Sequence, residues 1–245
     1  MSRHVLVTGA GNGIGAATAK AFGAAGDHVI VTDLDEAAAD LVAEEIAIVG
    51  GSASAHHLDV SDPSAWQRLA AQLAAERRLP GVVVNNAFHR VVRQAHELDE
   101  LDWNAQLSAS LGGVYRSVRT FHQSLAAARG SIVNVASVHA VLGFPAHPAY
   151  AAAKGGVVAL TRQLAYDYAP AIRVNSVLPG SISTRVWDGC DEGYLRTAAE
   201  AAMLKRFGSP DEVANAILFL AGEGASYITG AALTVDGGLT VSGFE

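Results

Sequence analysis

The chain has 245 residues, enough to bury a sizeable core, and half of them are apolar. Its formal net charge is -7 and it has no basic cluster, so we expect no nucleic-acid-binding surface. No uninterrupted apolar run reaches the ~18 residues of a membrane span. The single cysteine, Cys190, cannot form an internal disulfide, and no apolar signal segment precedes the first strand, so we expect a cytoplasmic protein.

Short runs rich in Val and Ile alternate with helical stretches along the whole chain. We expect strands at Val5–Val7, Val29–Thr32, Ala53–Leu58, Val82–Val84, Ser131–Val135, Ile172–Val177 and Leu233–Val235. We expect helices at Ala16–Ala25, Ala37–Ile48, Pro63–Glu76, Leu101–Ala127, Pro148–Tyr168 and Pro210–Ala221. Parallel strands that are buried on both faces have this composition, and strands separated by helices form βαβ units. The sequence therefore predicts one doubly wound α/β domain over residues 1–245.

A glycine-rich turn follows the first predicted strand. It reads Thr8-Gly9-Ala10-Gly11-Asn12-Gly13-Ile14-Gly15 and opens the first helical stretch. The glycines let the backbone approach a pyrophosphate, whose charge then lies at the positive N-terminus of the helix. Such a turn is a weak signal by itself, but here the strand before it and the helix after it supply the context of a dinucleotide site.

Asp33 ends the second predicted strand, about 20 residues beyond the glycine turn. A carboxylate at this place accepts hydrogen bonds from adenosine ribose hydroxyls and repels a 2′-phosphate, which favours NAD over NADP. No Arg or Lys follows it, because the next residues are Leu34, Asp35 and Glu36. The alternative is a carboxylate at a strand end that only faces solvent.

Three residues near the middle of the chain suggest proton transfer. Tyr150 and Lys154 are four residues apart in a helical stretch, a spacing that places both on one helix face. A nearby cation favours phenolate, so we expect Lys154 to lower the pKa of Tyr150. Ser137 follows a predicted strand, at the sheet edge where ligands bind in α/β folds. Taken alone, the tyrosine and lysine would be ordinary residues of an amphipathic helix.

These motifs, in this order, resemble those of the short-chain dehydrogenase/reductase family in its single-domain Rossmann-fold form. The match runs nearly end to end and comprises TGxxxGIG at residues 8–15, Asp59-Val60, Asn85-Asn86-Ala87, Ser137, Tyr150 to Lys154, the loop from Asn175 through Pro179-Gly180 to Ile182 and Thr184, Tyr227 to Gly230, and Val235 to Gly238. The resemblance implies an oxidoreductase that transfers hydride between NAD(H) and a secondary alcohol or its ketone, a small-molecule substrate.

The resemblance also implies roles for individual residues. Tyr150 would exchange the hydroxyl proton, Ser137 would bind the reacting oxygen, and Lys154 would hold the nicotinamide ribose and tune the tyrosine. NAD would contact Gly9, Asn12, Gly13, Ile14, Gly15, Asp33, Asp59, Val60, Asn86, Ala87, Tyr150, Lys154, Pro179, Gly180, Ile182 and Thr184. We expect Asn85 and Asn86 to brace the fourth strand, and we expect no metal site, since no spacing of Cys, His and carboxylate suggests one.

Two departures from the family pattern concern the catalytic centre. Ser110 stands where the family usually has an asparagine whose backbone carbonyl helps to anchor a water of the proton relay. We therefore include Ser110 among the catalytic residues and expect the proton relay to be modified. In the family, a glycine follows the segment that reads Asn85-Asn86-Ala87 here, and Phe88 replaces that glycine. Phe88 either narrows the pocket or only adjusts a loop. His89, His139 and His147 lie in segments expected near the cleft mouth, where each is a candidate for substrate contact.

Residues 185–208 break the alternation of strands and helices, with a helical signal only from Glu192 to Leu204. This segment resembles the family's substrate lid; the alternative is a surface excursion. The family also suggests a homotetramer, for which the apolar stretch from Leu233 to Phe244 would suit an interface. Two alternatives to an NAD-dependent alcohol dehydrogenase remain, an NADP-dependent oxoacyl-type reductase and a dinucleotide-binding regulator without catalysis.

Overall fold

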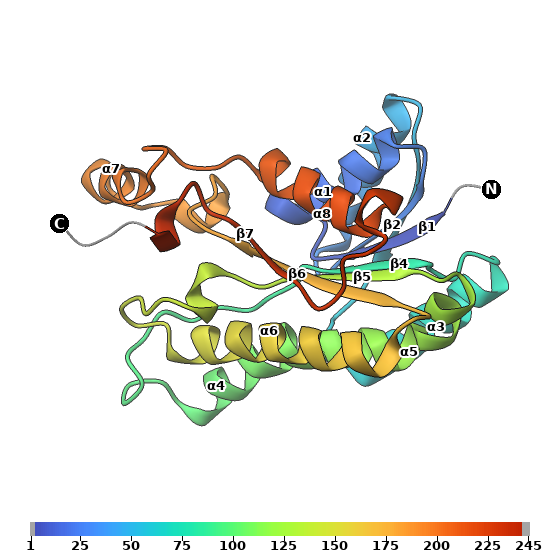
Figure 1. Ribbon diagram of the computed structural model, residues 1–245, viewed down its shortest axis with the longest axis horizontal. Coiled ribbons are helices and arrows are strands. Elements are labelled where there is room, and N and C mark those ends of the chain that lie inside the picture. Colours follow the sequence, from blue (N-terminus) through green and yellow to red (C-terminus); the bar gives the residue numbers. More distant parts are fainter. Residues whose placement is uncertain (1–2, 242–245) are drawn as a thin grey trace.

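The structure is a computed structural model that describes residues 3–241. Its strands are β1 His4–Thr8, β2 His28–Asp33, β3 Ser52–His57, β4 Val82–Asn85, β5 Ser131–Val135, β6 Arg173–Pro179 and β7 Ala232–Val235. They pair in parallel in one sheet with the order β3-β2-β1-β4-β5-β6-β7 (Figure 1). The prediction of a doubly wound Rossmann sheet of about seven strands is confirmed. The bounds of β6, Arg173–Pro179, differ from the predicted Ile172–Val177.

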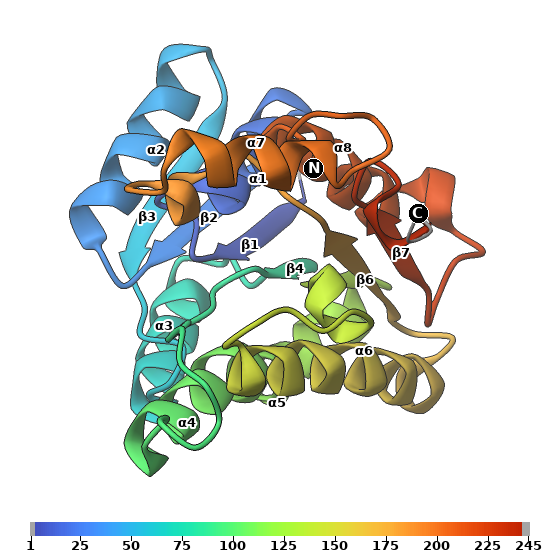
Figure 2. The same ribbon diagram turned by 90° about the vertical axis from the view of Figure 1, so that its left-hand side faces the viewer.

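Helices cover both faces of this sheet. One layer contains α1 Gly13–Ala24, α2 Glu36–Ile48 and α8 Pro210–Ala221, and the opposite layer contains α3 Pro63–Ala75, α4 Glu100–Leu107, α5 Gly113–Ala127 and α6 Pro148–Tyr168 (Figures 1 and 2). A further helix, α7 Glu192–Glu200, lies beyond the sheet edge formed by the strand C-termini. This helix ends before the predicted limit at Leu204.

Successive side chains of the central strands enter two different cores. Val5 and Val7 of β1 pack with Phe22 of α1, whereas Leu6 packs into the core that contains Phe121 of α5, and all five side chains are buried. This arrangement explains why the central strands read as continuous apolar runs: each strand is buried on both faces. Within residues 3–241, no helix has both the length and the apolar character needed to cross a bilayer.

The sheet order reverses at β1, which pairs with β2 on one side and β4 on the other. Loops that leave the carboxyl ends of β1 and β4 therefore run to opposite faces of the sheet, and a crevice opens between them. Most of the predicted site residues follow these strand ends, including the glycine turn after β1, Asp33 at the end of β2, Asn86 after β4 and Ser137 after β5. The topology thus brings distant motifs to one edge.

The predicted continuous helix Leu101–Ala127 is wrong in one detail. A π-helical turn, Ser108–Gly112, separates α4 from α5. Arg116 compensates for the altered hydrogen bonding of this turn, because its guanidinium donates to the Ser108 carbonyl at 2.8 Å and to the Ser108 hydroxyl at 3.0 Å. A Cβ on Gly112 would lie 2.7 Å from Arg116 Nη1, so the glycine leaves room for that contact. Single π turns of this kind are frequent at functional sites.

Candidate active site

A cleft of about 1430 Å³ opens at the carboxyl edge of the sheet. Pockets for one small ligand usually measure roughly 300–1,000 Å³, so this cleft has room for a dinucleotide together with a substrate. Its lining includes most of the predicted site residues, namely Gly9, Asn12, Gly13, Ile14, Asp33, Asp59, Val60, Asn86, Ala87, Ser137, Tyr150, Lys154, Pro179, Gly180, Ile182 and Thr184. Gly15 and Ser110 were also predicted as site residues but do not line it.

The glycine turn is shaped to leave space beside the backbone. Gly13 has a φ of +55°, and a Cβ at this position would lie 3.3 Å from Thr184 Cγ2 across the cleft. Gly15 has a different purpose, because its Cβ would lie only 2.1 Å from the Gly9 carbonyl oxygen. Gly15 therefore lets the start of α1 pack on the turn. The cradle fits a pyrophosphate at the N-terminus of the helix.

The end of the cleft next to β2 and β3 is acidic. Asp33 accepts hydrogen bonds from the backbone N–H groups of Gly11 at 2.8 Å and Asp35 at 3.0 Å, and Asp59 accepts from the backbone and hydroxyl of Ser61. These bonds fix both carboxylates while leaving lone pairs for other donors. The cleft residues around them are Leu34, Leu58, Val60 and Ser61, so no Arg or Lys is among them.

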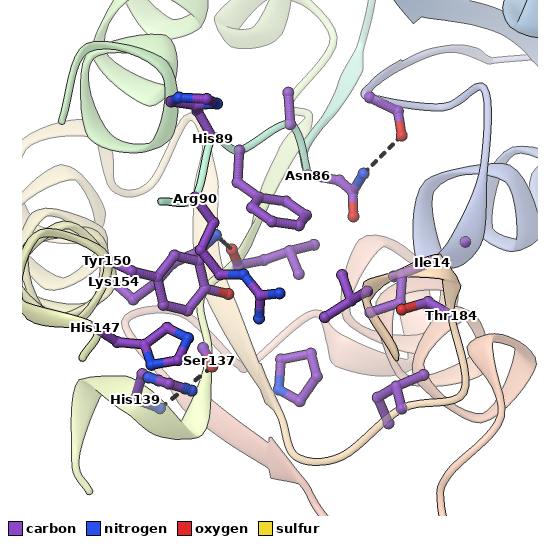
Figure 3. A pocket seen from close by; sticks show the side chains of 18 of the residues that line it. Ile14, Asn86, His89, Arg90, Ser137, His139, His147, Tyr150, Lys154 and Thr184 are labelled. Atoms are coloured by element: carbon purple, nitrogen blue, oxygen red, sulfur yellow. Dashed lines mark hydrogen bonds between the residues drawn. The ribbon is translucent and has the colours of Figure 1, made fainter. Parts of the chain in front are cut away.

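Asn85, the last residue of β4, and Asn86, which follows it, brace the sheet as expected. Asn85 donates to the side chain of Asn134 in β5 at 2.8 Å. The amide of Asn86 donates to the carbonyls of Thr8 at 3.0 Å and Gly9 at 2.9 Å, which ties the end of β4 to the glycine turn (Figure 3). Asn86 therefore joins the two sides of the crevice, and Asn85 ties β4 to β5.

At the other end of the cleft, Ser137, Tyr150 and Lys154 come together (Figure 3). Tyr150 and Lys154 lie on α6, with Lys154 Nζ 5.6 Å from the centre of the Tyr150 ring, so the prediction that they share one helix face is confirmed. Lys154 is only 2% exposed and donates to the carbonyl of Val135 at 2.7 Å. Ser137 lies just after β5, and its hydroxyl accepts from the backbone N–H of His139.

The expected pKa shift of Tyr150 is wrong in direction for the protein without cofactor. Burial raises the pKa of Tyr150, and this outweighs the lowering by its hydrogen bond to Ser137 and by the charge of Arg90. Burial also lowers the pKa of Lys154 to about 7. The four-residue spacing predicted that the groups would meet, but it carried no information on how far the surrounding protein removes them from water.

Phe88 and Ser110, the two residues that depart from the family pattern, lie at different places around the cleft. Phe88 lines the cleft, with its ring 5.9 Å from that of Tyr150 and 5.5 Å from Lys154 Nζ, so it narrows the pocket beside these two side chains. Ser110 is buried in the π turn, where its hydroxyl lies 3.3 Å from the backbone nitrogen of His89 and 3.5 Å from its carbonyl oxygen. The Ser110 side chain therefore supports the loop after β4.

Three histidines and Arg90 line the end of the cleft that holds Ser137, Tyr150 and Lys154, which we call the catalytic end. His89, His139 and His147 lie there as expected, and the rings of His139 and Tyr150 are 5.0 Å apart in an edge contact. Burial lowers the pKa of His139 to about 4. The sequence motifs did not point to Arg90, although its place three residues after Ala87 puts it on a loop at the sheet edge.

Part of the segment 185–208 also forms a wall of the cleft. Arg185, Trp187, Cys190 and Tyr194 line it, and the Trp187 indole donates to the carbonyl of Ile182 at 2.8 Å. Among residues 3–241, no three His, Cys, Asp or Glu side chains gather as a metal site would require.

Comparisons with known proteins agree with this geometry. The family model described as enoyl-(acyl carrier protein) reductase matches residues 9–240. The 3-oxoacyl-[acyl-carrier-protein] reductase FabG of Thermotoga maritima is 36% identical over 240 residues, covering 96% of this chain and 97% of that protein. Meso-2,3-butanediol dehydrogenase of Serratia marcescens is 37% identical over 242 residues, covering 98% and 96%. The chain belongs to the short-chain dehydrogenase/reductase family.

Solved structures of this family superpose closely on the chain. One is a Beutenbergia cavernae protein, described provisionally as an NAD(P)-dependent gluconate 5-dehydrogenase and holding NADP at low occupancy, with a TM-score of 0.92 and 34% identity over 98% of this chain and 97% of that one. As a short-chain dehydrogenase/reductase with this cleft, the chain is an NAD(P)-dependent oxidoreductase of alcohols and ketones.

Proposed function

We propose that the protein is an NAD-dependent dehydrogenase that oxidises a secondary alcohol or reduces the matching ketone. One observation carries this proposal: a single cleft holds Ser137, Tyr150 and Lys154 at one end and the carboxylate of Asp33 at the other. The first group provides acid-base chemistry, and the second recognises unphosphorylated ribose.

Each catalytic side chain has a defined task in this proposal. Ser137 donates to the reacting oxygen of the substrate, and Tyr150 exchanges the proton of that oxygen. Burial keeps Tyr150 protonated in the free protein, the form that gives a proton to a ketone, while Ser137 and Arg90 favour the phenolate needed for alcohol oxidation. Lys154 binds the nicotinamide ribose. The bound nicotinamide supplies the hydride acceptor or donor.

Ser110 contributes to proton transfer through its backbone in this proposal. Its buried position in a π turn supports a carbonyl-anchored relay, because π turns displace carbonyls from the regular helical hydrogen-bond pattern. The side chain is committed to the His89 backbone, so it serves as a brace.

The preference for NAD rests on the charge at the β2 end. A 2′-phosphate placed near Asp33 would meet a fixed carboxylate and no cleft-lining cation in that region. Calorimetry should therefore give a dissociation constant at least tenfold lower for NAD than for NADP, a difference of about 1.4 kcal/mol or more. Equal dissociation constants would contradict the cofactor assignment and would favour the oxoacyl-type reductase.

Turnover separates the dehydrogenase from the remaining alternative. We expect hydride transfer to NAD from members of a panel of secondary alcohols, followed as NADH absorbance. A regulator would bind NAD with the same affinity and turn over none of them. The names of the relatives include a neutral diol and a sugar acid, so they do not select a substrate for this chain.

Two further assignments complete the proposal. Residues 185–208 act as a lid over the substrate, which is supported by the eight residues of this segment that line the cleft. The chain forms a homotetramer with β7 at a subunit contact, since this edge strand is largely exposed and includes Leu233 at 38% exposure. Phe244, the end of the predicted interface stretch, lies outside the described residues. A monomer of ~25 kDa by light scattering would contradict the assembly.

A further inference from the structure

Arg90 brings an uncompensated positive charge into the catalytic end of the cleft. Its side chain reaches from the loop after β4 toward the Tyr150 hydroxyl (Figure 3), and its charge acts on the pKa of Tyr150. Within residues 3–241 its guanidinium makes no hydrogen bond or ion pair. A guanidinium carries five donors, so this one is available to a ligand.

The backbone around Arg90 is held in place. The Ser110 hydroxyl binds the main chain of His89, and the backbone N–H of Arg93 donates to the carbonyl of Ala146 at 2.9 Å. The second bond joins the loop after β4 to the loop that carries Phe144 and His147. Arg90 therefore extends from a braced segment into the space beside the catalytic tyrosine.

Charges are distributed unevenly along the cleft. Its acidic lining residues, as far as residues 3–241 show, are Asp33 and Asp59, and both lie at the ends of β2 and β3. The lining of the catalytic end contains Arg90, Lys154 and Arg185, together with the three histidines, but no carboxylate. A substrate with a negative charge would be attracted there, and it would give the guanidinium the partner that the protein does not supply.

The wall of the cleft beside Arg90 suits a substrate that carries one negative charge on an otherwise apolar skeleton. Burial lowers the pKa of both His139 and His147, so these imidazoles are neutral near pH 7 and add hydrogen-bonding capacity without charge. Phe88 and Phe144 provide apolar surface, the latter with its ring 4.3 Å from that of His139. One planar guanidinium pairs with one carboxylate through two parallel hydrogen bonds. A dianionic phosphate would favour a second cation beside Arg90, and the others at this end are Lys154, which donates to the Val135 carbonyl, and Arg185, on the segment 185–208.

We propose that Arg90 binds a carboxylate of the substrate, so that the enzyme acts on hydroxy acids or keto acids whose secondary alcohol or ketone lies on a compact apolar skeleton. This inference rests on the proposed dehydrogenase function, and it assigns Arg90 as the residue that selects acids over neutral alcohols.

The test uses pairs of secondary alcohols on aliphatic rings and chains, each pair consisting of a hydroxycarboxylate and its primary amide. The amide has nearly the same shape but no charge. For the wild-type protein with NAD, kcat/KM should be at least ~10-fold higher for the acid. Arg90→Gln should lower kcat/KM for the acid by about 10- to 100-fold, mainly through KM, which is the range of one charge-assisted hydrogen bond. Values for the amide should fall by a smaller factor and mainly through kcat, because the Arg90 charge also favours the phenolate of Tyr150.

Two variants sharpen the comparison. Arg90→Lys keeps the charge without the planar fork and should retain part of the preference for acids. Arg93→Gln removes a positive charge from an exposed position three residues away that does not line the cleft, and it should leave both series unchanged. NAD affinity and thermal melting, measured for every variant, establish that the fold and the cofactor site are intact.

The possible outcomes separate the two levels of the proposal. Amides used as well as acids would overturn the carboxylate assignment while leaving the dehydrogenase in place. An equal loss for acid and amide in Arg90→Gln would also overturn it, because Arg90 would then only shape the site. Preference for phosphorylated alcohols over carboxylates would replace the carboxylate by a phosphate. No turnover in either series or with the panel of secondary alcohols, with NAD bound, would overturn the proposed function itself.

Discussion

The two ends of the cleft are built in different ways. The end beside β2 and β3 consists of strand ends and a glycine turn from the first 61 residues, and its polar contacts are mostly backbone N–H groups and carbonyls. The catalytic end is assembled from loops and from the helices α6 and α7 between residues 88 and 201, and its character comes from side chains. The first end is acidic and the second is basic.

This difference separates binding of a common cofactor from recognition of a particular substrate. Backbone donors at a helix start depend on glycine positions and on little else, so a short motif is enough to specify them. Side chains such as Arg90 and Phe88 acquire their roles only when several loops meet. Changes at the catalytic end should therefore alter turnover or selectivity, while changes at the other end should alter cofactor choice.

The largest effect is expected at Tyr150. Tyr150→Phe should fold and bind NAD normally but lose at least ~100-fold in turnover, or about 2.7 kcal/mol in barrier, because the proton exchanger is removed. Single-turnover measurements of NADH formation would check this. Tyr194→Phe is the matched control, since Tyr194 lines the same cleft from α7 and should tolerate the change within a few-fold. Surviving activity in Tyr150→Phe would place the proton donor elsewhere.

Lys154 should make the stability of the cofactor-free protein depend on pH. Its pKa is about 7 in the folded protein and close to 10.5 when unfolded. Between these values the unfolded chain binds more protons, so stability should rise with pH. From pH 7 to 9 the gain should be roughly 2 kcal/mol, since each pH unit contributes at most about 1.4 kcal/mol per proton.

Urea unfolding at pH 7 and pH 9 would measure this slope. Lys154→Met should flatten it, because the buried amine is gone. Lys20→Met removes a lysine whose side chain is 49% exposed, and it should leave the slope unchanged. The same slope in wild type and Lys154→Met would show that Lys154 is protonated in the folded state.

At the acidic end, Asp33→Asn should narrow the preference for NAD over NADP by about tenfold, or about 1.4 kcal/mol. The amide oxygen still accepts from the Gly11 N–H, so the turn keeps its brace while the repulsive charge is lost. Calorimetry with both cofactors measures the gap. Asp35→Asn, the control, removes the neighbouring exposed carboxylate. If it narrows the preference for NAD over NADP by a similar factor, then the overall negative charge of this region, rather than Asp33, determines the choice of cofactor.

The smallest effect is expected at Ser110. Ser110→Ala should change kcat by less than ~10-fold, under about 1.4 kcal/mol, because its hydroxyl contacts at 3.3 and 3.5 Å are long and the backbone carbonyl remains. Steady-state kinetics with one acid and its amide would detect any shift of the loop that carries Arg90. A loss as large as that of Tyr150→Phe would show that the hydroxyl itself takes part in proton transfer.

The sequence alone determined the strand order along the chain, the glycine turn and the meeting of Tyr150 with Lys154. Each of these depends on local spacing: runs of Val and Ile specify buried strands, and a separation of four residues specifies one helix face. The strand bounds moved by one or two residues, as for β6, because the pairing of neighbouring strands defines where a strand ends.

Only the tertiary structure decided the π turn, the position of Arg90 and the pKa of Tyr150, because these features depend on contacts between residues far apart in the sequence. The π turn at Ser108–Gly112 is accompanied by hydrogen bonds from Arg116, which lies one turn beyond it and also donates to the Val60 carbonyl on another segment. Arg90 lines the cleft from a loop that a hydrogen bond from Arg93 to Ala146 joins to a second loop far away in sequence. The pKa of Tyr150 rises because segments distant in sequence surround the phenol and desolvate it, and burial of that kind is a property of packing that no local pattern encodes.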